Sequence, residues 1–440
     1  MERDIVVIGG GPAGLAAALT AAEAGVGRVL IIEREDELGG ILNQCIHDGF
    51  GLFSLGQRLT GPEYAAVFTR RVRETGIECW LGTMVLDVGS DRSLVVAHPR
   101  LGTVTVWAGA VVLAMGCRER TRQQLLIPGT RPAGVYTAGA AQRYVNRDGF
   151  LPGRRAVILG SGDIGLIMAR RLTLEGAEVE GVYEILPHPS GLTRNVVQCL
   201  EDFGIPLHLS HTITEIRGRQ RVEAVVVACV DAGRRPIEGS ERVIPCDTVI
   251  LSVGLIPENE LSRAAGMVID PVTGGPVVDQ DFQTTVPGIF ACGNVVHVHD
   301  LVDYVTWAGQ RAGRGAVRYR REGAPSQELR EVRAGDNVAY VVPQFIRGQP
   351  SESLDLYLRV VEPARQVQLV AAAGGKIVAR RYEPVVRPPE MILLRLEADA
   401  LTAASPGASL VVDARLRQET TGERTNHSPE SNVWGEDNED

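Results

Sequence analysis

The sequence lacks every cysteine pattern that holds a metal cluster or builds a disulfide scaffold. Its seven cysteines are spread over 440 residues, and no two of them form a Cys-x-x-Cys pair. A disulfide framework, a zinc ribbon and a cysteine-ligated iron–sulfur cluster each need more closely spaced cysteines. We therefore expect none of the three, and we predict no metal site.

The chain also lacks an excess of positive charge. Its 45 Lys and Arg residues stand against 54 Asp and Glu residues, which gives a formal net charge of −9. No basic stripe stands out, so we expect no nucleic-acid partner. Residues 419–440 hold seven acidic residues and a single basic one, Arg424. We predict that residues 418–440 form an acidic disordered tail.

A long uninterrupted apolar run is missing as well. Residues 5–22 carry no charge, but Pro12 and four glycines interrupt them, and acidic residues flank Arg3. A membrane span needs about 20 consecutive apolar residues, and a signal peptide starts with a positively charged stretch. We expect no membrane span and a cytoplasmic location. The length suffices for two or three domains.

What the sequence does contain is a dinucleotide-binding motif at its N-terminus. Residues 5–8 predict a buried strand, and a glycine turn and a helix of small residues follow. A second strand, 28–32, ends at Glu33, an acid at the spacing that suits a ribose hydroxyl. The turn and the first helical residues, which would hold the pyrophosphate, are Gly9, Gly11, Pro12, Ala13 and Gly14.

The same motif occurs a second time within the chain. Strand 155–159 precedes a glycine turn, and the matching acid is Glu184. The predicted nucleotide contacts of the turn are Gly160, Gly162, Asp163, Ile164 and Gly165. A carboxylate at this position repels a 2′-phosphate, so we expect NAD(H) rather than NADP. Hydride transfer through a flavin needs two such sites facing each other. The alternative is that the second motif has lost its nucleotide and is kept only as a structural element.

Three further phrases resemble a known group of flavoproteins. They are ELGGILNQCIH at 37–47, CRERTR at 117–122 and GSGDIGLIMARR at 160–171. Over residues 1–320 the chain resembles the two-dinucleotide flavoproteins of the pyridine nucleotide-disulfide oxidoreductase superfamily. Within that superfamily it is most similar to the flavoprotein subunits of opine oxidase, hydrogen cyanide synthase and sarcosine oxidase, and to small flavoproteins associated with glycerol-3-phosphate dehydrogenase.

The resemblance implies an α/β fold with two Rossmann-like domains. An FAD-binding domain would comprise residues 1–123 and 246–322, with an NAD-binding domain, 124–245, inserted between them. After residue 323 the pattern changes, and only strand-like runs are recognised over 331–417. These runs predict a C-terminal β-domain resembling a β-sandwich. Partner docking, self-association and core stabilisation all remain open as its role.

The resemblance also implies FAD and NAD(H) as cofactors. Beyond the two motifs, it implies cofactor contacts from Arg34, Gly39, Gly40, Ile41, Gly116, Gly254, Gly293 and Asn294. Asn294 stands where relatives carry an aspartate that binds the ribityl chain, and its amide oxygen can still accept a hydrogen bond. Cys45 and His47 are the candidate catalytic residues. Only one cysteine is present there, so a dithiol-disulfide cycle is not expected.

His297 and His299 invite a metal interpretation, because alternate residues of a strand share a face. No other cluster has ligand spacing, so we favour a place near the flavin. A helix over 302–320 should then direct its N-terminus toward the flavin.

Together these features predict an FAD-dependent NAD(P)H oxidoreductase that passes hydride between NAD(H) and FAD. The resemblance places it in a glycerol-3-phosphate- or opine-type complex, with partner dehydrogenase and iron–sulfur subunits, and a homo-oligomer is also open. One alternative is a catalytically idle, flavin-bound assembly protein. Another is a single-cysteine NADH oxidase or peroxidase that uses Cys45.

Overall fold

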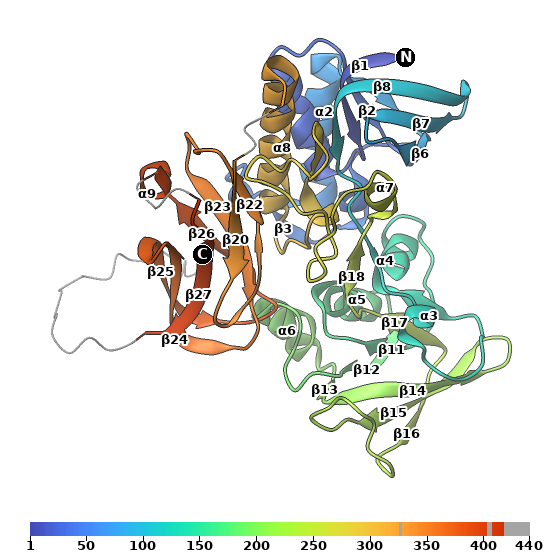
Figure 1. Cartoon of the computed structure of the whole chain (residues 1–440). Coiled ribbons are helices and arrows are strands. Elements are labelled where there is room, and N and C mark those ends of the chain that lie inside the picture. The colour runs from blue at the N-terminus through green and yellow to red at the C-terminus, as the bar shows by residue number, and fades with distance from the viewer. Residues whose placement is uncertain (325–327, 403–406, 418–440) are drawn as a thin grey trace, which may run out of the picture.

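Three units make up the structure, a computed structural model that describes residues 1–324, 328–402 and 407–417 (Figure 1). The predicted tail, 418–440, lies outside the described residues. The first unit holds the first glycine motif, the second holds the second motif, and a C-terminal β-domain packs beside the first. Within the described residues, no helix is both long and apolar enough to cross a membrane.

The first unit is built on a seven-stranded sheet. Its strands run in the order β5 (Glu78–Trp80), β2 (Val29–Ile32), β1 (Glu2–Ile8), β8 (Gly102–Leu113), β7 (Ser93–His98) and β6 (Met84–Val88), with β19 (Ile289–Ala291) pairing β8. β1 is parallel to β2 and β8, while β6, β7 and the first half of β8 form an antiparallel meander. Every residue of β2 is buried, as expected for a strand covered on both faces.

Helices cover this sheet and close the first core. They are α1 (Pro12–Glu23), α2 (Gly61–Thr75) and α8 (Val302–Glu322), with the short α7 (Glu260–Ala264) and the 3₁₀ turns η1 (Gly40–Gln44) and η3 (Gly293–Val295) nearby. α2 begins at a capping box in which the Thr60 amide donates to the Glu63 carboxylate at 2.8 Å. A two-stranded pair, β3 (Asp48–Phe50) and β4 (Leu59–Thr60), precedes it.

The second unit repeats the parallel architecture. Its five strands run in the order β10 (Val135–Thr137), β17 (Thr248–Leu251), β11 (Arg155–Leu159), β12 (Glu178–Glu184) and β13 (Leu207–Leu209), all parallel. The helical segments are α3 (Arg122–Leu125), α4 (Ala138–Asn146), α5 (Asp163–Leu174), α6 (Thr193–Cys199) and η2 (Glu201–Phe203). An antiparallel sheet of β14 (His211–Gly218), β15 (Val222–Cys229) and β16 (Arg242–Pro245) completes it.

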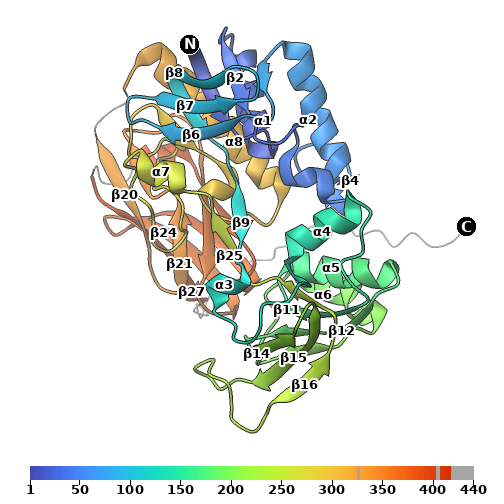
Figure 2. The ribbon, with the colours of Figure 1, turned by 90° about the vertical axis from the view of Figure 1, so that its right-hand side faces the viewer.

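Two antiparallel strands connect the first and second units. They are β9 (Cys117–Glu119) and β18 (Leu255–Pro257), and Figure 2 shows β9 descending from the upper unit toward the lower one. The mixed α/β class with Rossmann-like sheets is confirmed. The exact domain boundaries at 123/124 and 245/246 stay predictions.

The C-terminal β-domain consists of two packed sheets. One has the order β22 (Phe345–Arg347), β20 (Leu329–Ala334), β27 (Leu410–Leu416), β24 (Ala364–Ala373) and β25 (Lys376–Val386). The other has the order β21 (Val338–Val342), β23 (Leu354–Val360) and β26 (Ile392–Leu396). Apolar side chains of both sheets form one core. Three residues of this domain, Val342, Tyr357 and Met391, belong instead to the core of the first unit.

The local structure differs from the sequence expectation in three places. A short helix, α9 (Ala398–Thr402), lies in the region expected to hold only strands. The sequence also predicts a helix over 196–203; the observed helix α6 begins earlier, at Thr193, and ends at Cys199, and the separate turn η2 follows it. Residues 297–299 follow a 3₁₀ turn and are not a strand, so His297 and His299 do not share the face of a strand.

Candidate functional site

The first glycine motif forms the predicted strand, turn and helix. Gly9 has φ +105°, and a Cβ there would lie 2.4 Å from the Ala114 carbonyl oxygen. A Cβ on Gly14 would lie 1.9 Å from the Gly9 carbonyl oxygen, so α1 packs on the turn at a distance that only glycine allows. Pro12 starts α1, whose first turn has no acidic residue and no side-chain cap. Its free amides therefore fit an anionic pyrophosphate.

Glu33 is fixed at the end of β2 beside this turn. Its side chain is buried, and its two oxygens accept hydrogen bonds from the Gly10 amide at 2.6 Å and the Glu35 amide at 2.9 Å. The carboxylate thus faces the turn, where a ribose hydroxyl would be held. Arg34 and Ile41 are both exposed.

The second motif reproduces the same geometry. Glu184 is buried, and its oxygens accept hydrogen bonds from the Ser161 amide at 2.9 Å and the Leu186 amide at 3.0 Å. The acid follows its amide partner by 23 residues in both motifs. Two hydroxyls add to the second site, since Ser161 Oγ and Ser190 Oγ donate to Glu184 at 2.6 and 2.7 Å. Ser190 was missed by sequence reasoning because it lies in a loop outside the motif.

Asp163 has a structural partner of its own. It is the first residue of α5, and its Oδ1 accepts hydrogen bonds from the Leu192 amide at 2.8 Å and the Asn195 side chain at 2.6 Å. These bonds fix the start of α6, which explains why that helix begins before the expected residue. Gly162 caps α5 without a side-chain hydrogen bond, so the amides there also fit an anion.

Four of the other glycines predicted to contact a cofactor lie either beside the first motif or at the connection between the units. The Gly39 amide donates to the Gly10 carbonyl at 2.8 Å, and a Cβ on Gly40 would lie 3.0 Å from Gly11 Cα. The two glycine turns are therefore in contact. Gly116 and Gly254 flank β9 and β18, and the Gly254 carbonyl accepts from the Arg120 amide at 3.1 Å.

Cys45 is placed as a neutral thiol. It follows η1, and its Sγ lies 3.3 Å from the Ile41 carbonyl oxygen and 3.7 Å from Gln142 Oε1. Burial raises the pKa of the Cys45 thiol to about 12. All seven cysteines are described and free, so Cys45 has no disulfide partner. This environment does not activate a thiolate.

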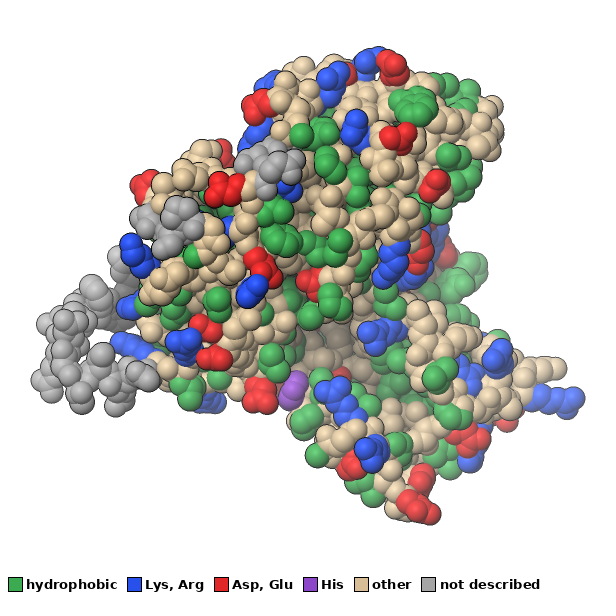
Figure 3. All heavy atoms as spheres, viewed as in Figure 1, with side chains coloured by type: hydrophobic (Ala, Val, Ile, Leu, Met, Phe, Trp, Pro, Cys, Tyr) green, Lys and Arg blue, Asp and Glu red, His purple; other side chains and the backbone are tan. Residues whose placement is uncertain are grey.

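His47 lies where the first and second units approach each other. Burial lowers the pKa of His47, and the carboxylates of Asp48 and Asp163 oppose that shift. Burial also raises the pKa of Asp300, and the Asp163 carboxylate adds to that rise. Asp163 belongs to the second motif, whereas His47 and Asp300 belong to the first unit. The second motif therefore lies within electrostatic range of residues beside the first, and Figure 3 shows the surface hollowed where the units meet.

Asn294 is held by the histidine five residues later. Its Oδ1 accepts from the His299 backbone amide at 3.0 Å and lies 3.2 Å from His299 Nδ1. The amide oxygen that was expected to accept a bond from the flavin is thus already engaged, because the chain turns back on itself after Gly293. Within the described part of the chain, the Asn294 NH₂ group bonds only Cys117 Sγ, at 3.7 Å. Among the described residues, no group of three or more His, Cys, Asp or Glu side chains is arranged to hold a metal.

Contacts between the units involve residues that the motifs did not reveal. Gln44 is buried, and its amide donates to the Gly139 carbonyl at 2.8 Å and to Gln142 Oε1 at 3.1 Å. Gln44 stands inside the ELGGILNQCIH phrase, but its partners are almost a hundred residues away, beyond the reach of a local pattern.

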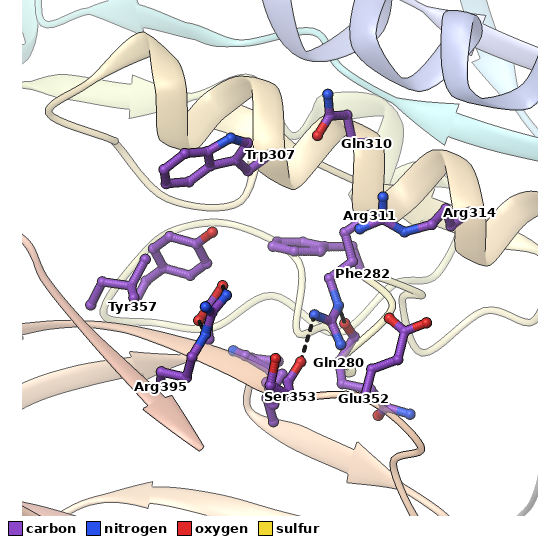
Figure 4. A pocket seen from close by; sticks show the side chains of 14 residues that line it. Gln280, Phe282, Trp307, Gln310, Arg311, Arg314, Glu352, Ser353, Tyr357 and Arg395 are labelled. Carbon is purple, nitrogen blue, oxygen red and sulfur yellow. Dashed lines mark hydrogen bonds and ion pairs between the residues drawn. The ribbon is translucent and has the colours of Figure 1, made fainter. Parts of the chain in front are cut away.

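A cavity of about 600 Å³ opens between α8 and the C-terminal β-domain (Figure 4). Trp307 and Arg311 of α8 line one side of it, and Tyr357 and Arg395 of the β-domain line the other. None of the residues predicted to bind a cofactor lines this cavity. It is separate from the two glycine motifs.

Comparison with known proteins assigns the chain to a family. The sequence profile of the family described as pyridine nucleotide-disulphide oxidoreductase matches residues 3–312. The chain belongs to this family. It is an oxidoreductase whose cofactors are FAD and NAD(P)H, and the glycine cradles and fixed carboxylates described above fit those groups.

Several individual proteins are similar to this family member. The HcnB chain of hydrogen cyanide synthase from Pseudomonas protegens is 29% identical, over 61% of this chain and 60% of that protein. An opine oxidase subunit of Agrobacterium tumefaciens is 28% identical, over 66% of this chain and 61% of that protein. The chain thus spans about three fifths of the length of these two relatives. The resemblance to both kinds of protein is confirmed.

Solved structures share the fold. The thioredoxin reductase of T. acidophilum matches 72% of this oxidoreductase and 98% of its own chain, with a TM-score of 0.59 and 23% identity. That of Lactococcus lactis matches 73% and 99%, with a TM-score of 0.60 and 21% identity. Both matches leave more than a quarter of this chain uncovered.

Proposed function

We propose that this chain transfers hydride between NAD(H) and noncovalently bound FAD. The observation that carries the proposal is the pair of glycine motifs with the same acid-to-amide geometry, at Glu33 and Glu184, together with the electrostatic proximity of Asp163 to His47. Hydride transfer needs the two cofactors to meet, and Asp163 of the second motif lies within electrostatic range of His47 in the first unit.

In this proposal each motif holds one cofactor. The FAD contacts would come from Gly9, Gly11, Pro12, Ala13, Gly14, Glu33, Arg34, Gly39, Gly40, Ile41, Gly116, Gly254, Gly293 and Asn294. The NAD(H) contacts would come from Gly160, Gly162, Asp163, Ile164, Gly165 and Glu184. Bound FAD supplies the hydride-accepting chemistry, and the chain contributes binding and orientation. The free backbone amides at the N-termini of α1 and α5 bind pyrophosphate, and the buried carboxylates of Glu33 and Glu184 bind ribose.

NAD(H) is the proposed nucleotide because Glu184 is a fixed carboxylate. Four donors hold it, at distances between 2.6 and 3.0 Å. A carboxylate held so firmly does not swing away from a 2′-phosphate, so NADPH meets a negative charge there.

We further propose that the chain works as one component of a multi-subunit dehydrogenase, of the glycerol-3-phosphate or opine type. Two relatives carry the word subunit in their names, for hydrogen cyanide synthase and opine oxidase. The other electron partner would be a dehydrogenase chain. An iron–sulfur relay, where one is needed, would come from another chain.

Anaerobic mixing with NADH tests the hydride transfer directly. The purified protein is loaded with FAD, freed of excess cofactor and mixed with NADH, and the visible flavin absorbance is followed. Rapid bleaching is expected. An oxidised spectrum that persists with saturating NADH would instead support the idle assembly protein, and a protein that stays colourless after incubation with FAD would refute the proposed site.

The single-cysteine alternative finds no support in the surroundings of Cys45. A peroxidatic or oxidatic cysteine reacts as the thiolate, whereas burial raises the pKa of this thiol to about 12. Hydride transfer to FAD needs no thiolate. We therefore propose that Cys45 lines the site without covalent chemistry.

A further inference from the structure

The segment between Asn294 and α8 is clamped by the C-terminal β-domain. Arg359, on β23, donates to the Val298 carbonyl at 3.2 Å and to the Tyr340 hydroxyl at 3.1 Å. The same guanidinium forms an ion pair with Asp300 and bonds the Pro389 carbonyl. Both charged side chains are largely buried, with exposed fractions of 16% and 14%. A buried ion pair with this many additional bonds fixes its backbone partners firmly.

The clamped segment determines how the Asn294 side chain is oriented. His299 holds Asn294 Oδ1 through its backbone amide and its ring Nδ1. Because an amide oxygen only accepts, Nδ1 carries the ring proton and Nε2 is an acceptor. The oxygen end of Asn294 is thus fixed. Among the described residues, the NH₂ end is left with a sulfur as its only partner, a weak acceptor.

Three buried ring nitrogens in this segment have no hydrogen-bond partner among the described residues. His299 Nε2 and both ring nitrogens of His297 are buried and make no hydrogen bond to any described residue. The two rings lie 4.1 Å apart, and Tyr357 of the β-domain lies 5.5 and 5.7 Å from them. Burial lowers the pKa of both histidines, that of His299 to about 3, so both are neutral near neutral pH.

We propose that Arg359 and His299 are positioning residues for FAD. Arg359 fixes the backbone at 298–300, His299 fixes the amide of Asn294, and the Asn294 NH₂ group then donates to FAD. This inference rests on the proposed FAD site, and it gives the β-domain a role in that site within the same chain. The sequence led us to expect that the Asn294 amide oxygen accepts a hydrogen bond from FAD. In this proposal its NH₂ group instead donates one to FAD.

Full-length variants at Arg359 test the first step. Arg359→Met removes the guanidinium but keeps much of its bulk, and Arg359→Lys keeps the charge. Arg395→Met is the matched control, because Arg395 lies in the same domain and pairs with Asp355 on the wall of the cavity, away from the clamped segment (Figure 4). We measure the FAD dissociation constant, the visible flavin spectrum and the flavin midpoint potential.

For Arg359→Met we expect FAD binding weaker by about tenfold to a hundredfold, the range for losing a charge-assisted hydrogen-bond network, with a shifted spectrum and potential. Arg359→Lys should fall between that variant and the wild type, and Arg395→Met should match the wild type. Wild-type affinity, spectrum and potential in Arg359→Met would overturn the inference. Should Arg359→Met not fold, Arg359→Lys and the histidine variants decide.

His299 variants test the second step. Asparagine places a donor nitrogen where His Nδ1 stands, whereas leucine has none, and both leave the backbone amide of residue 299 in place. We expect His299→Leu to weaken FAD binding and shift the flavin spectrum and potential, and His299→Asn to restore them in part. Equal loss in both variants would refute the role of the Nδ1 proton.

The outcome is separable from that of the proposed function. Hydride transfer is judged on the wild type, by bleaching with NADH. A wild-type protein that binds FAD without being reduced would refute hydride transfer, while the order of affinities among the Arg359 and His299 variants would still decide the positioning roles.

Discussion

Replacing Glu184 by glutamine should relax the choice between NADH and NADPH. The carboxylate is 3% exposed and held by four donors, so it meets the bound nucleotide in one position. At an effective dielectric constant of about 20, two unit charges about 5 Å apart repel by about 3 kcal/mol. Glu184→Gln removes this term, and we expect the NADPH-to-NADH ratio of dissociation constants to fall by about tenfold to a hundredfold.

Glu184→Gln also has a structural cost, but that cost cancels in the NADPH-to-NADH ratio of dissociation constants. The new NH₂ group faces backbone and hydroxyl donors, and an unsatisfied buried donor costs about 1 to 3 kcal/mol. That cost weakens both nucleotides alike, so titrations with each nucleotide isolate the charge. Glu180→Gln is the control, because Glu180 lies on the same strand and pairs with Arg155. An unchanged ratio in Glu184→Gln would refute Glu184 as the selective group.

Three further predictions concern the cradle, the thiol and the histidine pair. Gly14→Ala puts a methyl group 1.9 Å from a backbone oxygen, so we expect a stability loss of about 3 kcal/mol and poor FAD retention, while Gly27→Ala, with nothing within 4 Å, should be neutral. Cys45→Ser should keep flavin reduction by NADH, and iodoacetamide should label Cys45 slowly at neutral pH, since burial raises its pKa to about 12; rapid labelling would contradict this. Burial lowers the pKa of His299 to about 3 and lowers that of His297 as well. As the pH falls below about 6.5, the unfolded chain binds protons at both histidines that the folded chain does not, so stability falls; for His299 this range extends to about pH 3, at about 1.4 kcal/mol per pH unit. Urea unfolding across this pH range should show that the free energy of unfolding falls less steeply with falling pH in His297→Phe than in the wild type. Identical pH slopes in the two proteins would refute the prediction.

The parts of the fold that short-range sequence patterns determine were predictable. A buried strand, a glycine turn and an acid at fixed spacing specify a backbone path, and both motifs fold in that way. The family resemblance likewise predicted the mixed α/β class, and the strand-like runs over 331–417 predicted a C-terminal β-domain. The strand-like runs recognised in the sequence begin only at Asn337, so strand β20 was missed; only Val332 in it is buried, and the alternation that indicates a strand is absent. Helix α9 has five residues, too few to show a helical period.

The contacts that shape the candidate site were not predictable, because they join residues distant in sequence. Asp163 holds Asn195 across 32 positions, and Arg359 reaches Asp300 across 59. No local pattern indicates which of many arginines is buried against one of many aspartates. Asn294 is the instructive case, since the sequence indicated a hydrogen-bonding role for its side chain, while its orientation depends on His299, which the chain brings back to it.

Two of the three roles considered for the β-domain, partner docking and stabilisation, are therefore not independent. One sheet of this domain contributes Tyr357 to the first core and Arg359 to the segment that leads from Asn294 to α8. At the other end of that segment, Asp303 in the first turn of α8 accepts the Ser54 amide at 2.7 Å, which ties the loop after β3 to the same helix. A partner that shifts the β-domain must strain the Arg359 bonds, because this buried guanidinium joins β23 to that segment. The flavin potential of a complex should then differ from that of the isolated chain, and Arg359→Met should remove that difference.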